Sequence, residues 1–355
     1  MKIIRENKNG STSAIMESRG KEYFIRFGDI KNIENEAANY GLISSYFPVP
    51  KLIAHNIDKH GSVIIYEKIK NIAKDKGLLT DVMNSKKAIN LTKFEKCVDK
   101  IIKIYKSSID SSLQKRRLKY YPNQLLFHDR LKKRGRFNQF YANNKRLIKI
   151  GGQIMEFGEL KEYKLIENNR ESCMVKNIFG FIKKYKFSDT DVACLHGDPN
   201  ETNITSNAKF LDLEGAGLNP VSAEFAVFIW RFYAQSNYLS PRYNPRLYDD
   251  HSKVFNNLHL PKKVSFDIDC KSKIIYLSYK YQVGKEQTFI LKKFIHKIVN
   301  EYYKAKKFKR GNKNISELKW FILLRVLGTY DIFAMDQVDM FFSLSAITWI
   351  YKEKL

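Results

Sequence analysis

The stretch LHGDPNETNI (residues 195–204), followed by FLDLEG (residues 210–215), decides which fold we expect for this chain. Within it, Asp198 precedes Asn203 by five positions, and Asp212 follows nine residues later, after a turn-prone segment. A hairpin through that turn brings Asp212 beside Asn203 and leaves Asp198 at its mouth. The two segments therefore predict three oxygen-bearing side chains around one cleft.

Phosphoryl transfer needs side chains of this kind. A carboxylate orients the acceptor hydroxyl and takes its proton, while oxygen ligands hold Mg²⁺ against the nucleotide phosphates. In protein kinases the base Asp precedes a metal-binding Asn by five positions, and a second metal-binding Asp follows on the next hairpin strand. Pro199 stiffens the loop after Asp198, which favours a fixed carboxylate. The alternative, in which Asp198 and Asn203 only cap or turn the backbone, explains either residue alone better than it explains the joint pattern.

These segments resemble the aminoglycoside phosphotransferase and choline kinase-like superfamily, whose pattern is H-G-D-x-x-x-x-N followed by an apolar strand that carries an Asp. The resemblance implies an α+β, bilobal protein-kinase-like fold, with a small β-rich N-terminal lobe and a large, mainly helical C-terminal lobe. It implies that Asp198 is the catalytic base and that Asn203 and Asp212 bind Mg²⁺. It also makes His196 a structural member of the loop.

Two further acidic residues have open roles. Glu214 lies two residues past Asp212, on the same strand face, so it either helps to hold a second metal or pairs with a nearby cation. Glu224 stands where the family usually has an Asp that braces the catalytic loop, and its side chain is one methylene longer.

The N-terminal residues resemble the nucleotide-binding part of the same family. Ser11, Thr12 and Ser13 lie between two extended runs, where the family places a loop whose N–H groups and hydroxyls cradle phosphate oxygens; a plain surface turn is the alternative. Arg26 stands at the position of the phosphate-contacting Lys of the family. Because Arg and Lys differ in shape and hydrogen bonding, we expect a different nucleotide geometry.

Two more segments extend this resemblance. Glu36 matches the helix Glu that pairs with the cation, and Glu34 is the competing candidate. The segment 63–68 resembles the strand and hinge whose backbone binds the purine. It places Tyr66 and Lys68 at the nucleotide site.

We expect the chain to divide into two lobes. Residues 1–70 form the nucleotide-binding lobe, with a hinge near residues 66–69, and residues 71–355 form the helical lobe, with the catalytic loop at residues 195–214.

Local patterns predict the secondary structure. Strands are expected at 14–18, 22–27 and 63–66, and a helix at 32–46 ends before two prolines. Apolar residues at helical spacing over 94–105 predict a buried helix face.

The composition is strongly basic. The 355 residues include 63 Lys and Arg against 37 Asp and Glu, for a formal net charge of +26. Such a surface attracts nucleotides, phosphorylated metabolites, nucleic acid or an anionic membrane face, although a solvated Lys-rich surface explains it equally well. A polycationic acceptor is repelled at long range unless its pocket is locally acidic.

Two segments concentrate this charge. Residues 115–136 carry nine basic residues interleaved with aromatic ones. That pattern fits nucleic-acid binding, an anionic-acceptor pocket, or a solvated helix face with its aromatics in the core, which we favour. Residues 304–313 carry six basic residues and no acid, and we expect an exposed loop there.

The expected location is the cytoplasm. The four cysteines are scattered and contain no C-x-x-C pair, which argues against a disulfide framework or a zinc site. The N-terminus lacks the apolar region of a signal peptide, and the apolar stretch 340–351 is too short to span a bilayer and is expected to be a buried helix.

Two functions remain in view. The first is a kinase that uses ATP (or GTP) and Mg²⁺ to phosphorylate a hydroxyl of a small molecule, with sugars and anionic metabolites ranked above aminoglycosides. The second is a catalytically silent kinase-like fold that binds RNA or another anionic partner. The complete set of Asp198, Asn203 and Asp212 favours the first. The sequence contains no zinc finger or RNP-like motif, so nucleic acid ranks as the less expected partner.

Overall fold

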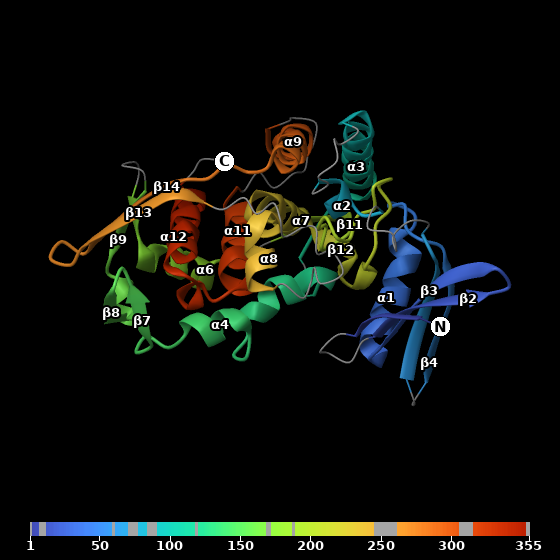
Figure 1. The fold of residues 1–355 in the computed structure, drawn as a ribbon, viewed down its shortest axis with the longest axis horizontal. Coiled ribbons are helices and arrows are strands. Elements are labelled where there is room, and N and C mark those ends of the chain that lie inside the picture. Colours follow the sequence, from blue (N-terminus) through green and yellow to red (C-terminus); the bar gives the residue numbers. More distant parts are fainter. Residues whose placement is uncertain are drawn as a thin grey trace.

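A β-sheet part and a helical part lie at opposite ends of the molecule (Figure 1). The chain is seen in a computed structural model, which describes residues 2–6, 12–58, 61–69, 77–83, 91–117, 120–167, 172–186, 189–244, 261–304 and 315–352. The mixed α and β content agrees with the predicted fold class.

The N-terminal part is a five-stranded antiparallel sheet in the order β1-β2-β3-β5-β4. Its strands are β1 (Lys2–Glu6), β2 (Thr12–Ser18), β3 (Lys21–Gly28), β4 (Leu52–Asp58) and β5 (Gly61–Glu67). Arg19 and Gly20 join β2 to β3 with φ angles of 51° and 71°. Two consecutive positive φ angles match the twist of a tight hairpin. The strands expected at 14–18, 22–27 and 63–66 are therefore confirmed.

Helix α1 (Ile30–Ile43) packs against this sheet. Asp29 caps its N-terminus by accepting a hydrogen bond from the N–H of Asn32. Its buried face carries Ile33, which meets Ile64 and Tyr66 of β5 in a small apolar cluster. The helix starts two residues before the expected first residue, 32, and ends three residues before the expected last residue, 46.

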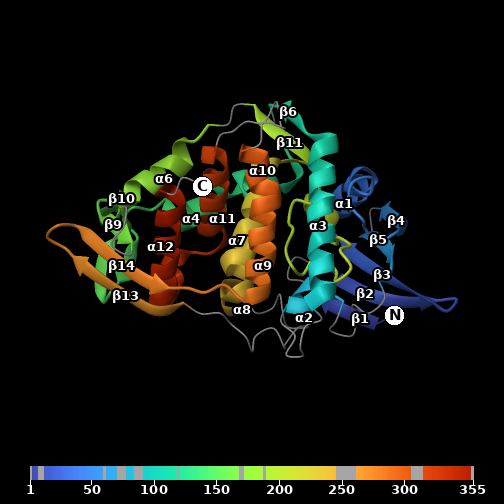
Figure 2. The ribbon, with the colours of Figure 1, turned by 90° about the horizontal axis from the view of Figure 1, so that it is seen from above.

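Helices dominate the rest of the chain. They are α2 (Leu79–Met83), α3 (Leu91–Ser112), α4 (Arg136–Tyr141), α5 (Phe157–Leu160), α6 (Val175–Lys184), α7 (Val221–Trp230), α8 (Ser240–Tyr243), α9 (Lys285–Phe294), α10 (Asn300–Lys304), α11 (Ile315–Thr329) and α12 (Gln337–Lys352). Helix α3 lies on the side of this part that is nearer to the sheet (Figures 1 and 2). Its predicted face is confirmed, since Phe94, Val98, Ile101 and Tyr105 are all buried.

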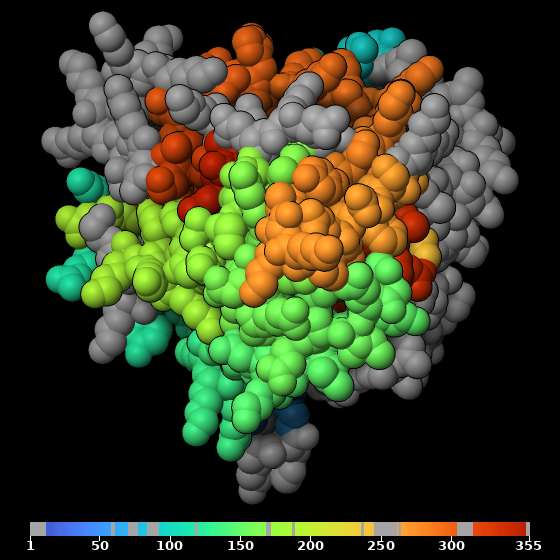
Figure 3. All heavy atoms as spheres, turned by 90° about the vertical axis from the view of Figure 1, so that its left-hand side faces the viewer, coloured from blue at the N-terminus to red at the C-terminus, as the bar shows by residue number. Residues whose placement is uncertain are grey.

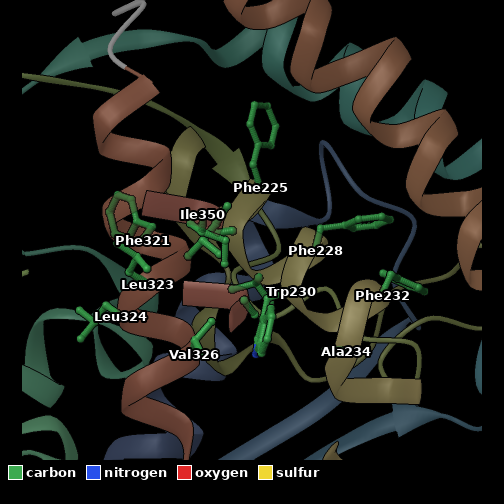
Figure 4. Close-up of a cluster of buried hydrophobic side chains, with 14 of the residues drawn as sticks. Phe225, Phe228, Trp230, Phe232, Ala234, Phe321, Leu323, Leu324, Val326 and Ile350 are labelled. Atoms are coloured by element: carbon green, nitrogen blue, oxygen red, sulfur yellow. The ribbon is translucent and has the colours of Figure 1, made fainter. Parts of the chain in front are cut away.

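The core of the helical part forms around α7 and α11. Both helices are apolar on nearly all sides, which is the pattern of a helix surrounded by protein. Figure 4 shows Phe225, Phe228 and Trp230 of α7 in the same cluster as Phe321 of α11 and Ile350 of α12. The apolar stretch 340–351 falls within α12 and is buried, as expected. Among the described residues, no helix combines the length and apolar character needed to cross a membrane.

Three small sheets complete the helical part. A three-stranded sheet in the order β12-β11-β6 leads into the catalytic loop; its strands are β6 (Gln114–Arg116), β11 (Thr190–Leu195) and β12 (Gly217–Pro220). At the end of the molecule away from the N-terminal sheet lie the hairpin of β7 (Leu147–Ile150) and β8 (Gln153–Glu156) and the four-stranded sheet of β9 (Lys164–Glu167), β10 (Ser172–Met174), β13 (Lys262–Asp269) and β14 (Ile274–Lys280). Figure 3 looks onto this end, with the β7–β8 region in green and the β13–β14 hairpin in orange.

The lobe boundary near residues 66–69 stays a prediction. Strand β5 ends at Glu67, and the next described helix is α2. Residues 70–76 and 305–314 lie outside the described residues, and the second range includes almost all of the expected basic loop at 304–313.

Candidate active site

The predicted catalytic loop follows buried strand β11. Gly197 has a φ of +90°, and a Cβ atom there would lie 2.0 Å from the carbonyl oxygen of Gly215, so this position requires glycine. After it, the side chain of Asn203 donates through Nδ2 to the carbonyl oxygen of Asp198, at 3.1 Å. Asn203 thus closes the loop through its Nδ2 and leaves its amide oxygen, Oδ1, able to serve as a metal ligand.

The expected hairpin forms between residues 203 and 211. The N–H of Leu211 donates to the carbonyl oxygen of Asn203 at 2.8 Å, and Ile204 pairs with Phe210 in an antiparallel bridge. His196 is fully buried and its Nε2 lies 2.6 Å from the carbonyl oxygen of Leu211. Burial lowers the pKa of His196, which keeps the imidazole neutral as a link between the two segments. Asp212 therefore starts directly beside the loop that carries Asp198.

Glu224 braces the loop from helix α7. Its Oε2 accepts a hydrogen bond from the N–H of Gly197 at 2.8 Å, and its Oε1 accepts one from the hydroxyl of Tyr105 at 2.7 Å. The longer side chain thus reaches the loop backbone, and the open role of this residue resolves in favour of bracing. Burial raises the pKa of Glu224 to about 7, while the two hydrogen bonds act in the opposite direction.

Arg26 of β3 joins the N-terminal sheet to the segment after the loop. Its Nη1 lies 2.7 Å from Oε2 of Glu36 and 3.2 Å from Oδ1 of Asp212, and its Nη2 lies 3.2 Å from Oε2 of Glu214. One guanidinium group therefore contacts three carboxylates. Of the two roles left open for Glu214, a second metal ligand or the partner of a cation, the structure shows the pairing with a cation. Asn39 of α1 adds two hydrogen bonds to the carbonyl oxygens of residues 213 and 214.

Helix phase decides between Glu36 and Glu34. Glu36 is buried on the face of α1 that also carries Ile33, whereas Glu34 is exposed. The hydroxyl of Tyr66 donates to Oε1 of Glu36 at 2.9 Å. Arg26 contacts the other carboxylate oxygen, Oε2, so each oxygen of Glu36 has its own partner. Burial raises the pKa of Glu36, and the charge of Arg26 opposes that shift.

Asp198 has a neighbour that the sequence did not suggest. Nη2 of Arg325, on helix α11, lies 3.4 Å from Oδ1 of Asp198, and Nδ2 of Asn200 lies 3.2 Å from its Oδ2. About a third of the Asp198 side chain, 32 %, is exposed. The available signal was a lone arginine inside the apolar run 320–328.

Solved structures match the fold of nearly the whole chain, while no protein-family model and no curated protein matches the sequence. A thermostable mutant of the aminoglycoside phosphotransferase APH(4)-Ia, in ternary complex with ADP and hygromycin B, superposes with a TM-score of 0.53 at 8 % identity, covering 99 % of this chain and 94 % of that chain. Another APH(4)-Ia structure gives 0.52 at 9 % identity, covering 99 % and 93 %. The chain has the aminoglycoside phosphotransferase fold. At this identity the similarity establishes the fold alone.

The structure describes most of the expected nucleotide-binding residues. Thr12 and Ser13 lie in β2, where Ser13 faces Arg26 across the strand pair, and Ser11 lies outside the described residues. Lys68 directs its ammonium group to Glu22, at 2.7 Å. The contacts of these residues with a nucleotide, like the backbone contact expected at Tyr66 and Lys68, stay predictions.

The donor set at the loop fits Mg²⁺. Asn203 and Asp212 offer amide and carboxylate oxygens, which are the ligands that this ion prefers. Their backbones are joined by the hydrogen bond from Leu211 to Asn203. Across the described part of the chain, no group of three or more His, Cys, Asp or Glu side chains could hold a metal ion. Mg²⁺ is usually held by one or two protein ligands together with substrate phosphates and water.

The basic segment 115–136 agrees only in part with the expected solvated face whose aromatic side chains lie in the core. Phe127 and Phe137 are fully buried, in line with that interpretation, and Tyr120 is exposed. Arg130, however, is only 7 % exposed.

Asn123 is a loop-supporting residue that the sequence did not suggest. Its Nδ2 donates to the carbonyl oxygen of Gly197 at 3.1 Å.

A second buried contact holds the loop to the end of α7. Arg231 forms a bidentate pair with Glu201, with Nε and Nη2 each 2.7 Å from a carboxylate oxygen. Glu201 lies inside the loop between Asp198 and Asn203. Planar pairing of this kind restrains orientation as well as distance, so it stiffens the loop near its middle.

Proposed function

We propose that this protein is an Mg²⁺-dependent phosphotransferase that moves the γ-phosphate of ATP to a hydroxyl group of a small molecule, a sugar or an anionic metabolite. The observation that carries the proposal is the link from Arg26 to both Glu36 and Asp212. It puts a cation from the N-terminal sheet next to the predicted metal ligand, beside the loop that holds the predicted base. Charge neutralisation and positioning are what phosphoryl transfer asks of a protein.

In this proposal Arg26 binds nucleotide phosphate oxygens, and Glu36 holds the guanidinium in place. Asn203 and Asp212 hold Mg²⁺, which neutralises charge on the phosphates when bound. The contact of Arg26 with Asp212, at 3.2 Å, keeps the cation beside the predicted metal ligand.

Asp198 accepts the acceptor hydroxyl proton. As it does so, the hydroxyl oxygen forms a bond to the γ-phosphorus, and the bond from that phosphorus to the bridging oxygen breaks, which leaves ADP. Glu224 and Asn203 keep the Asp198 loop in one conformation through their hydrogen bonds. A fixed carboxylate lowers the barrier mainly by orientation.

The free thiols support a cytoplasmic location. All four cysteines are unpaired, and Cys97, Cys173 and Cys194 are buried. Reduced cysteines and the use of ATP both suit a reducing compartment.

The test is Mg²⁺-dependent formation of ADP by the purified protein over a panel of hydroxyl-bearing metabolites, with ATP and GTP compared. We expect turnover with at least one acceptor and its loss in excess EDTA. A nucleotide-induced thermal shift measures binding separately. Retention of RNA at physiological salt, with neither a thermal shift nor turnover, would instead favour a catalytically silent fold.

A further inference from the structure

Two arginines are buried close to Asp198. Arg130 comes from the short helical turn His128–Leu131 and is 7 % exposed, and Arg325 comes from α11 and is 5 % exposed. A buried guanidinium loses its hydration, so in most proteins it is paired with carboxylates. These two are poorly paired.

Each arginine leaves part of its hydrogen-bonding capacity unused. Arg130 donates through Nη1 to the hydroxyl of Thr329 at 2.9 Å, and no carboxylate of the described residues lies within ion-pair distance of it. Arg325 reaches Asp198 only at 3.4 Å, and its buried Nε has no hydrogen-bond partner among the residues that the structure describes. An unsatisfied buried N–H group costs about 1–3 kcal/mol.

Among the described residues, the other buried arginine is Arg231, and it is well paired, as is the partly buried Arg26. Arg231 has a bidentate contact with Glu201, and Arg26 meets three carboxylates. The poor pairing of Arg130 and Arg325 is therefore specific to the surroundings of Asp198.

The fold makes room for Arg130. Gly328 lies in α11, where glycine weakens the helix, and a Cβ atom there would lie 2.6 Å from Cδ of Arg130. Exposed Arg136 adds a third positive charge. Burial lowers the pKa of Arg130, and the charges of Arg325 and Arg136 act in the same direction, while the charge of nearby Asp198 opposes them.

We propose that Arg130 and Arg325 bind an acidic group of the acceptor, a phosphate or a carboxylate, and so hold its hydroxyl beside Asp198. This inference rests on the proposed phosphotransferase function. An anion would supply the missing hydrogen bonds, since the guanidinium fork matches carboxylate and phosphate oxygens. This anion site differs from the nucleotide site, because Arg26 contacts Asp212 whereas Arg325 contacts Asp198. The acceptor is thus a hydroxy acid or a phosphorylated alcohol, and the positive charge of the two arginines disfavours a polycationic aminoglycoside.

In the experiment, inorganic phosphate is titrated into protein that is saturated with Mg²⁺ and AMP-PNP, and calorimetry measures its binding. The bound analogue occupies the site of the transferred phosphate, so the remaining affinity for phosphate reports the acceptor side. We expect binding to the unmodified protein and a loss on the order of tenfold to a hundredfold in Arg130→Gln, since one charged hydrogen-bonding group is removed. The matched control is Lys133→Gln, an exposed charge of the same segment, which should leave binding unchanged.

A second variant covers the case in which Arg130→Gln does not fold. Gly328→Ala retains every charge and favours the helix, but its methyl group displaces Arg130, so phosphate binding should also weaken. Circular dichroism melting confirms folding of each variant. A turnover comparison of alcohols with their phosphorylated counterparts should favour the phosphorylated member.

Three results would overturn the inference. Phosphate binding that is absent in the unmodified protein, or that is equal in Arg130→Gln, removes the anion site. A loss of AMP-PNP affinity in Arg130→Gln assigns the arginine to the nucleotide instead. If AMP-PNP binds nowhere, the proposed function fails by itself, and the same phosphate titration without nucleotide then judges the anion site alone.

Discussion

Nη1 of Arg26 lies 3.2 Å from Oδ1 of Asp212, although 186 residues separate them in the sequence. This contact connects the N-terminal sheet to the segment that follows the predicted catalytic loop. The same nitrogen lies 2.7 Å from Glu36, so the cation is held from the helix on one side and from the catalytic segment on the other.

Asp198→Asn should leave nucleotide binding intact and lower turnover by a factor of about 10²–10⁴, because the amide cannot accept the hydroxyl proton. The measurement is kcat for ADP formation, next to the AMP-PNP dissociation constant from calorimetry. Asp110→Asn, an exposed change on α3, is the control. Full activity of the Asp198 variant would show that another group is the base.

Arg26→Lys should raise the KM for ATP by about tenfold, and Arg26→Gln by about a hundredfold. Lysine preserves the charge but cannot place two nitrogens toward Glu36, Asp212 and Glu214 at once, and glutamine leaves all three carboxylates without a cation. Lys21→Gln removes an exposed charge from the same strand and should have little effect. An unchanged KM in Arg26→Gln would separate this residue from the nucleotide.

Glu224→Gln should remove a pH dependence of stability. Burial raises the pKa of Glu224 from 4.5 to about 7, so the native state holds a proton that the unfolded state releases between these values. The free energy of unfolding therefore falls as the pH rises from 4.5 through 7, by an amount on the order of 2 kcal/mol for this group. Glutamine does not titrate; its one carbonyl oxygen can still accept from the N–H of Gly197, while its NH₂ group donates to the hydroxyl oxygen of Tyr105.

Urea unfolding of both proteins at pH 5 and pH 8 measures this effect. The variant should gain stability relative to the unmodified protein only at the higher pH. Buried Glu317, whose pKa is also raised to about 7, remains in both proteins and cancels in the comparison. An equal difference at the two pH values would mean that Glu224 does not titrate in this range.

Gly197→Ala should destabilise the protein by about 3 kcal/mol or more and abolish activity, because the added methyl group meets the backbone of Gly215. Gly152→Ala is a matched control, since Gly152 also has a positive φ, of +87°, but open space around it. Its cost should be only about 1 kcal/mol. Thermal melting measures both, and equal costs would mean that the contact with Gly215 relaxes freely.

The local features of the fold were predictable from the sequence. The strands around Arg19 and Gly20 follow from turn chemistry and alternation, and the hairpin between Asn203 and Leu211 follows from the turn between them. Glu36 was also within reach, since it lies three residues after Ile33 and so shares its helix face. In each case the partners lie close together in the chain, and spacing limits their geometry.

The sequence by itself determined the order and spacing of Asp198, Asn203 and Asp212, because one loop and one turn carry all three. Only the tertiary structure decided that Arg325 contacts Asp198, that Arg130 lies within electrostatic reach of both, and that Glu214 pairs with Arg26. Those neighbours come from elements far apart in the chain. Their approach depends on how α11 packs against the loop and on the space left at Gly328, and side-chain packing between distant elements has no local signature in the sequence.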